Sequence, residues 1–306
     1  MFGRRPDGRR IRGIDPIVQI TPYLMPMRCD AQVMLKHNAD MERMSAYIRR
    51  QKRENGRTIS HMELIIAAYV RAVSQCPQVN RFIMNKQYYS RNNCTVSVTI
   101  LKDPKDADLG ETVIKVPFDL TDTIFEVSAR MQEKVEANRG VQQKNFLDKL
   151  VDFLFKVPVL PGLVAGTVKL LDRYGLCPKA LIDELPFHAG MYITNTASIG
   201  LHDVNHHIYN FGNVSLFFSM GSVEKIAVVE DGETRMKKFL PIGITADERV
   251  CSGAHYARLF TLMKYYIDHP EQLEVPPESV RFDPGMEYHV PKPKLPEPAK
   301  QSGVVS

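Results

Sequence analysis

The charged turn Asp247-Glu248-Arg249 is the part of the sequence with the clearest potential for chemistry. It follows a strand-like segment, residues 239–246, and precedes Ser252-Gly253, which begins an apolar helix. A strand that ends in a charged turn and leads into a helix projects side chains into a site. An ordinary glutamate titrates at about 4.3, and burial can raise this pKa to roughly 8–9. Glu248 is therefore predicted to be either a general base in a dry pocket or the structural ion-pair partner of Arg249.

A second polar cluster covers residues 202–207 and reads His-Asp-Val-Asn-His-His. Imidazole and carboxylate groups can bind metals or accept protons, so a metal site and a replacement base are both open readings. Gly200 and the polar run indicate a loop, in which His202 and His206 are not held one helical turn apart. We expect a solvated loop and no bound metal.

The composition predicts an ordinary soluble globular protein. The 306 residues are 44% hydrophobic and 25% charged, with a formal net charge of +5. Most of this charge lies in the first twelve residues, so no nucleic-acid-binding face is expected on the nearly neutral body. Five dispersed cysteines and an N-terminus without the apolar core of a secretion signal predict a cytoplasmic protein. The longest apolar stretch, 157–168, is short and broken by prolines, so no membrane partner is expected.

Several common catalytic signatures are missing from the sequence. It contains no Gly-x-x-x-x-Gly-Lys-Ser/Thr, Gly-x-Gly-x-x-Gly, His-Glu-x-x-His or Gly-x-Ser-x-Gly pattern. The sequence therefore lacks the usual signatures of nucleotide hydrolysis, dinucleotide redox chemistry, zinc proteolysis and serine-esterase chemistry.

Hydrophobic periodicity predicts alternating helices and strands around the charged turn. Asp40 is expected to cap a helix that ends at Gly56, and Ser60 with Glu63 forms a capping box for a buried helix over 62–73. Residues 17–24 are predicted to be extended. Further strands are predicted at 32–36, 94–100, 112–118, 190–196, 214–220 and 226–230, and further helices over 123–138 and 254–268. An Asp-Gly turn at 231–232 joins the last of these strands to the strand before the charged turn.

The chain is predicted to have three parts, a basic N-terminal arm (1–15), a main domain (16–275) and a proline-rich tail (276–306). The arm is expected to be a disordered or draped tail, or to reach a neighbouring subunit or an acidic partner. Inside the main domain, residues from about 143 to 175 are interpreted as a helical insertion, with one apolar helix over 146–155 and a second ending at Leu171. This insertion is open to three readings: a packed helical hairpin, a lid over a pocket, or an interfacial membrane patch.

The charged turn and the strand that ends near residue 196 resemble a known family. Catalytic domains of dihydrolipoamide acyltransferases, the cores of 2-oxo acid dehydrogenase complexes, carry Asp-His-Arg-x-x-Asp-Gly at the turn. Chloramphenicol acetyltransferase shares their fold and the His-x-x-x-Asp-Gly core. Residues 192–200 and 218–221 resemble two further strands of the family, and the order of elements follows it from about residue 20 to 269. In the turn, three residues match and two do not: Asp247, Arg249 and Gly253 fit the motif, whereas Glu248 replaces its histidine and Ser252 its aspartate.

This resemblance implies an α/β fold like that of chloramphenicol acetyltransferase, a mixed sheet with flanking helices, in a trimer or a multiple of it. It implies acyl transfer from an acyl-CoA to a thiol or hydroxyl acceptor, at sites between subunits and without a covalently bound cofactor or a metal. Glu248 would be the substituted base, Thr194 the oxyanion donor, and Ser252 the replacement of the ordering aspartate. Thr196 and Ser198 are alternative donors, and the supporting residues would be Asn195, Ser198, Arg249 and Gly253.

The exchange of histidine for Glu248 leaves a second function open. Glutamate is a weaker base than histidine by about two pKa units, which corresponds to a rate loss of at most about a hundredfold. The alternative is a non-catalytic pseudoenzyme that acts as an oligomeric scaffold, or that binds coenzyme A or an acyl chain without transfer.

Overall fold

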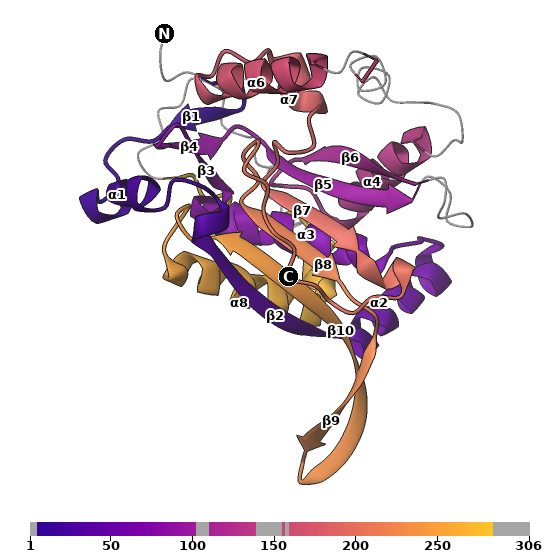
Figure 1. Ribbon diagram of the computed structural model, residues 1–306. Helices are drawn as coiled ribbons and strands as arrows, with labels where there is room; N and C mark the ends of the chain where they lie inside the picture. The colour runs from indigo at the N-terminus through magenta and orange to yellow at the C-terminus, as the bar shows by residue number, and fades with distance from the viewer. Residues whose placement is uncertain (1–4, 102–109, 139–154, 157–158, 284–306) are drawn as a thin grey trace, which may run out of the picture.

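The computed structural model describes residues 5–101, 110–138, 155–156 and 159–283. Its centre is a mixed sheet with the strand order β2–β10–β8–β7–β5–β6, to which β9 adds by pairing with β10 (Figure 1). β7 runs parallel to its neighbours β5 and β8, and the other pairs are antiparallel. The strands are β2 (Gln32–Asp40), β5 (Cys94–Leu101), β6 (Glu111–Phe118), β7 (Met191–Asn195), β8 (Leu216–Met220), β9 (Glu224–Glu230) and β10 (Glu233–Asp247).

Helices cover one face of this sheet, where α3 and α8 lie behind the strands in Figure 1. Asp40 caps the helix α2 (Met41–Asn55), and Gly56 ends it in a left-handed conformation with φ 64°. The predicted capping box of Ser60 and Glu63 is present, and the helix it begins is buried along almost its whole length. These helix predictions are therefore confirmed. The helices are α2 (Met41–Asn55), α3 (His61–Gln75), α4 (Ile124–Asn138) and α8 (Gly253–Asp268).

The prediction of an extended segment over 17–24 is wrong, because these residues belong to the helix α1 (Pro16–Leu24). Asp15 caps α1 by accepting a hydrogen bond from the amide of Ile17, and Pro16 lies in its first turn. Ile17 and Leu24 are exposed, and Pro22 is the buried residue of this helix. The apolar residues thus do not form the single inward stripe from which a helix is predicted.

A second, three-stranded sheet has the order β1–β4–β3, and its strands are β1 (Gly8–Arg10), β3 (Arg81–Met84) and β4 (Gln87–Arg91). The N-terminal arm is thus folded onto the body from residue 5. Buried Arg5 donates hydrogen bonds to Asp7 at 2.9 and 3.0 Å and to Asp172 at 2.7 Å. The second carboxylate oxygen of Asp172 lies 3.0 Å from Nε2 of His188. Burial raises the pKa of Asp172, but His188 and Arg5 outweigh it, so this pKa is lowered.

The insertion contributes one described helix, α6 (Leu160–Arg173), which lies beside the small sheet in Figure 1, and the short helix α7 (Lys179–Glu184) follows it. The second predicted helix is therefore present, whereas most of the first, 146–154, lies outside the described residues. Asp172 is the buried residue of α6, and the helix exposes apolar side chains such as Leu163 and Leu170. Among the described residues, no helix is long and apolar enough to cross a membrane.

Residues 201–213 cross the sheet face opposite the main helices. The amide of Val204 donates to Oγ of Ser219 at 3.0 Å, and the Ser219 hydroxyl donates to the Val204 carbonyl. Gly243 lies beneath this crossing, where a Cβ atom would be 2.3 Å from the Val204 carbonyl oxygen. The expectation of a solvated loop is therefore wrong for the part of this segment that packs on β8 and β10.

Candidate active site

Asp247 ends β10 in a buried ion cluster. Its carboxylate accepts hydrogen bonds from Nε and a terminal nitrogen of Arg249 at 2.8 and 2.7 Å. Nε of Arg28 lies 4.0 Å from the same carboxylate, and all three side chains are buried. The ion pair of this turn is therefore made by Asp247 and Arg249. Among the described residues, Glu248 is not the ion-pair partner of Arg249.

Glu248 follows immediately and is exposed in the single chain. Its amide donates to the carbonyl of Ala31 at 2.9 Å, which fixes the backbone of the turn against the start of β2. Its carboxylate makes no hydrogen bond or ion pair with a described residue. The backbone at the proposed base is therefore fixed, but the described residues do not enclose its side chain.

Ser252 and Gly253 form the junction between the turn and α8. Oγ of Ser252 lies 2.8 Å from Nδ1 of His255, so the hydroxyl that replaces the family's aspartate is paired with an imidazole. Burial, with a smaller effect of Arg81, lowers the pKa of His255 and favours its neutral form. Sequence reasoning missed this pair, although a serine at a helix start and a histidine three residues later lie on one helix face.

The hydroxyls on and after β7 differ in their availability. Thr196 is buried, and its Oγ1 lies 3.0 and 2.9 Å from the carbonyls of His202 and Met220. The Ser198 hydroxyl donates to the carbonyl of Asn195 at 2.6 Å. Thr194 is half-buried and has no hydrogen bond to a described residue. Of the three predicted candidates, Thr194 has the hydroxyl that is free to act as a donor.

Thr194 and Glu248 are separated along the sheet. Thr194 is in register with Ser219 on β8, and Ser219 is in register with Gly243 on β10. Asp247 lies four residues beyond Gly243, which is about 13 Å along a strand that is itself two positions away from β7. A single chain therefore does not bring the predicted base and the predicted oxyanion donor together.

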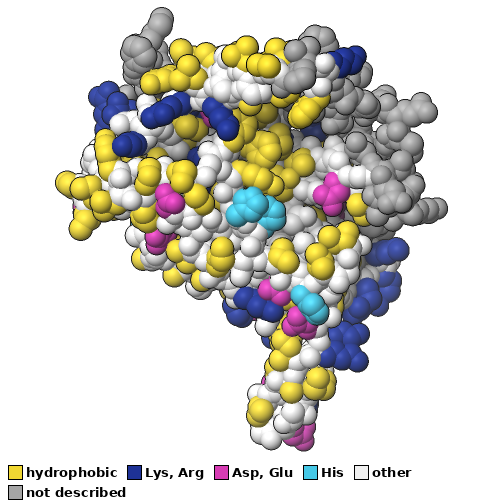
Figure 2. All heavy atoms as spheres, viewed as in Figure 1, with side chains coloured by type: hydrophobic (Ala, Val, Ile, Leu, Met, Phe, Trp, Pro, Cys, Tyr) yellow, Lys and Arg dark blue, Asp and Glu magenta, His cyan; other side chains and the backbone are white. Residues whose placement is uncertain are grey.

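Within 202–207, His206 and His207 stack on each other with ring centroids 4.6 Å apart, and His202 has different partners. His206 stacks on Phe217 with ring centroids 4.0 Å apart, whereas Nδ1 of His202 lies 3.2 Å from a carboxylate oxygen of Glu224. Histidine side chains lie on the sheet face that Figure 2 presents. Within the described ranges, no three histidine, cysteine or acidic side chains are arranged to hold a metal ion.

Mild acid is expected to destabilise the fold through four histidines. Burial lowers the pKa of His37, His61, His206 and His255, and the charges of Lys264, His207 and Arg81 add to this for His37, His206 and His255 respectively. The unfolded chain then binds protons more readily below about pH 6.5, so stability is greatest above that pH and is lost as the pH falls. The urea midpoint should be lower at pH 5.5 than at pH 7.5.

The variant His61→Gln isolates one histidine in this experiment. Nε2 of His61 lies 3.1 Å from Oγ of Ser45, a contact that a glutamine amide can replace. The difference between the two midpoints should shrink in this variant, because one titrating group is lost. A midpoint that stays constant or rises on acidification would contradict the expected sign.

The C-terminal part of the chain matches a family model. Residues 188–275, which include β7, β8, the charged turn and α8, match the model described as 2-oxoacid dehydrogenases acyltransferase (catalytic domain). No curated protein sequence matches the chain.

Solved structures share the fold of the whole body. A probable dihydrolipoamide acetyltransferase of Listeria monocytogenes 4b F2365 is 14% identical, with a TM-score of 0.52 over 84% of this chain and 93% of that one. The cubic core of a pyruvate dehydrogenase multienzyme complex is 15% identical, with a TM-score of 0.54 over 84% and 88%. A chloramphenicol acetyltransferase is 10% identical, with a TM-score of 0.51 over 85% and 99%. The chain thus has the fold shared by chloramphenicol acetyltransferase and these acyltransferase cores. The predicted resemblance to the dihydrolipoamide acyltransferase catalytic domains is confirmed.

Proposed function

We propose that this chain is an acyl-CoA-dependent acyltransferase whose site is assembled between two copies in a cytoplasmic homotrimer, or a multiple of a trimer. The observation that carries the proposal is the separation of Thr194 and Glu248 along the sheet. Both side chains lack partners among the described residues, and Glu248 is exposed, so each is available to a neighbouring copy. The assembly of a structural neighbour into a cubic core supports the oligomer.

In this site Glu248 of one copy accepts the proton of a thiol or hydroxyl acceptor. The acceptor's sulfur or oxygen then bonds to the thioester carbonyl, the bond from carbon to the CoA sulfur breaks, and the proton passes to the released CoA thiolate. The Thr194 hydroxyl of the neighbouring copy donates to the oxygen that becomes negative. Contact with the neighbour would also shield Glu248 from water.

The remaining predicted residues have supporting roles. Arg249 holds Asp247 and thereby the backbone of the turn, and Gly253 is the first residue of α8. The Ser252 hydroxyl, bonded to His255, offers a polar group four residues after the base. Asn195 and Ser198 shape the end of β7 next to Thr194.

The proposal predicts that Glu248→Gln lowers acyl transfer by about 10²–10⁴-fold, because the general base is lost. Thr194→Val should cost about 10²–10³-fold through the missing oxyanion donor. The assay is release of free CoA thiol from a panel of acyl-CoAs with thiol, hydroxyl and amine acceptors. Glu136→Gln and Thr261→Val, exposed on α4 and α8, are matched controls that should keep the wild-type rate.

A second function is favoured by the exposure of Glu248 and by the engagement of the Ser252 hydroxyl with His255. It is a non-catalytic oligomeric scaffold or a CoA and acyl-chain binder. Release of no thiol with any pair would select it over transfer. Turnover that survives Glu248→Gln would instead place the base elsewhere, with the 202–207 histidines tested next.

A further inference from the structure

Two adjoining cavities lie on the side of the molecule that carries α1 and α6. The larger, about 590 Å³, lies between α1 and the β1–β4 edge, and the smaller, about 350 Å³, lies between the end of α1, the β3–β4 turn and α6. Lys86 lines both cavities. Figure 2 shows lysine and arginine side chains gathered between α1 and α6 on this side.

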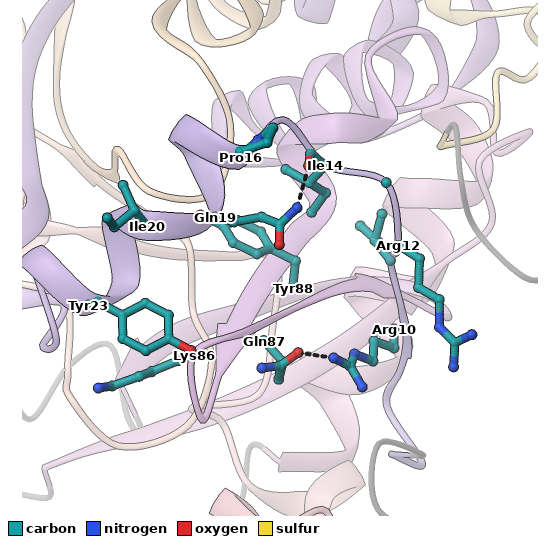
Figure 3. A pocket seen from close by; sticks show the side chains of 12 residues that line it. Arg10, Arg12, Ile14, Pro16, Gln19, Ile20, Tyr23, Lys86, Gln87 and Tyr88 are labelled. Atoms are coloured by element: carbon teal, nitrogen blue, oxygen red, sulfur yellow. Dashed lines mark hydrogen bonds between the residues drawn. The ribbon is translucent and has the colours of Figure 1, made fainter.

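The walls of both cavities are strongly positive. The larger is lined by the cations Arg10, Arg12 and Lys86 and by no carboxylate. Figure 3 shows Lys86 extended next to the ring of Tyr23 on one side, with Arg10 and Arg12 on the other. The smaller is lined by five cations and one carboxylate, that of Asp172: the cations are Arg28, Lys86, Lys169, Arg173 and Arg249.

The acidic groups at the smaller cavity are already engaged. Asp172 is 2% exposed and is bound by Arg5 and His188. Behind the wall of the smaller cavity, the Asp247 carboxylate lies 2.7 Å from a terminal nitrogen of Arg249 and 4.0 Å from Nε of Arg28. Two buried guanidinium groups therefore share one carboxylate.

Of the two buried arginines that line the smaller cavity, Arg28 has weaker compensation than Arg249. Beyond Asp247, its terminal nitrogens reach only the carbonyls of Ile83, Asn210 and Tyr209, at 3.3, 3.2 and 3.5 Å. Burial lowers the pKa of Arg28 to about 10 despite the opposing charge of Asp247. A buried cation with so little compensation is stabilised when an anion enters the space beside it.

Lys86 is placed at the junction by a strained turn. Asn85 and Lys86 connect β3 and β4, and both have left-handed backbones with φ 48° and 60°. Such two-residue turns favour glycine at the second position, and a lysine there is strained. Its ammonium lies 4.3 Å from the centroid of the Tyr23 ring, which holds it at the boundary between the cavities. Strain of this kind is often found where a side chain has a function.

Lys169 and Arg173 complete the opposite rim from α6. Lys169 has no hydrogen bond or ion pair with a described residue, and Nε of Arg173 donates to the Asn85 side chain at 3.1 Å. We propose that the two cavities together bind a small phosphorylated molecule, with its phosphate groups held at Lys86, Lys169 and Arg28. Because the cations are spread over both cavities, they fit a pyrophosphate or two separated phosphates better than a single phosphate.

None of the cavity-lining residues is the proposed base or oxyanion donor, so phosphate binding here does not depend on the groups proposed to react. Pyrophosphate binding should therefore be unchanged in Glu248→Gln and Thr194→Val, even if both abolish transfer. The two proposals can fail independently.

The test is titration of the full chain with inorganic pyrophosphate by calorimetry at low ionic strength. Lys86→Gly and Lys169→Gln should each weaken binding at least about tenfold, and added salt should weaken it further. Lys86→Gly removes the charge and relieves the left-handed strain, so its melting temperature should equal or exceed that of the wild type. Lys225→Gln, exposed on β9, removes one charge elsewhere and should bind as the wild type does.

Three results would overturn the proposal. The wild type shows no pyrophosphate binding, or both cavity variants bind as tightly as the wild type. Alternatively, vesicles of phosphatidylcholine with phosphatidic acid bind the protein while soluble pyrophosphate does not, which would assign these cations to a lipid surface.

Discussion

Replacing Asp247 with alanine is expected to lower the free energy of unfolding by about 3–5 kcal/mol. The substitution leaves Arg28 and Arg249 buried without their shared carboxylate, and an uncompensated buried charge is among the most costly defects in a protein. Arg28 and Arg249 are 6% and 3% exposed, so water reaches neither easily. The Tyr256 hydroxyl also donates to the Asp247 carbonyl at 2.8 Å, so disorder here spreads into α8.

Urea denaturation of the variant and the wild type measures this loss. The double variant Asp247→Ala with Arg28→Met should be more stable than Asp247→Ala alone, because one unpaired cation is removed with its partner. Asp183→Ala is the matched control: its exposed ion pair with Lys179 is worth at most about 1 kcal/mol. Equal losses in Asp247→Ala and Asp183→Ala would show that the buried pair is not needed for stability.

Replacing Arg5 with methionine is expected to have an effect of similar size, about 3–5 kcal/mol. Arg5 is the cation between Asp7 and Asp172, and its removal leaves two carboxylates close together in a buried place. His188 can compensate only one of them. The variant should therefore loosen the contact between the N-terminal arm and α6 as well as lower global stability.

The pH dependence of this variant provides a second check. Because the folded-state pKa of Asp172 is lowered in the wild type, its contribution is present above about pH 4 and is lost as the pH falls through that range. The stability gap between wild type and Arg5→Met should shrink accordingly on acidification. Arg235→Met, whose partner Glu233 is exposed, should change stability by at most about 1 kcal/mol at any pH. A gap that widens in acid would argue against the ionic origin of the effect.

Local signals allowed much of the fold to be predicted. Asp40, Gly56, Ser60 and Glu63 define helix ends through contacts within a few residues, and these contacts are formed as expected. The helix at 16–24 was mispredicted because its apolar residues face outward rather than toward the core. Its Asp15 cap and Pro16 were available as local signals.

The site could be predicted only in part, because its contacts join distant segments. The motif singled out Asp247 and Arg249, which do form an ion pair. Nothing local indicated that Arg28, more than two hundred residues away, would share that carboxylate. The pairing of Arg5 with Asp172 is of the same kind, since a basic run near a terminus usually indicates a solvated tail.

The position of Thr194 relative to Glu248 required the strand order. Sequence similarity assigned both residues to one site, whereas the register of β7, β8 and β10 separates them within the chain. The proposed function therefore has two copies of the chain bring them together.

Mixed oligomers test that central claim most directly. Glu248→Gln and Thr194→Val chains carrying different affinity tags are co-expressed and purified through both tags, and release of CoA thiol is measured. A trimer containing both variants has one interface with an intact Glu248 and an intact Thr194, so about a third of the wild-type rate should return. Separately purified variants mixed in the tube serve as the control and should stay inactive. An active wild type whose mixed oligomers are no faster than either variant would contradict a site shared between subunits.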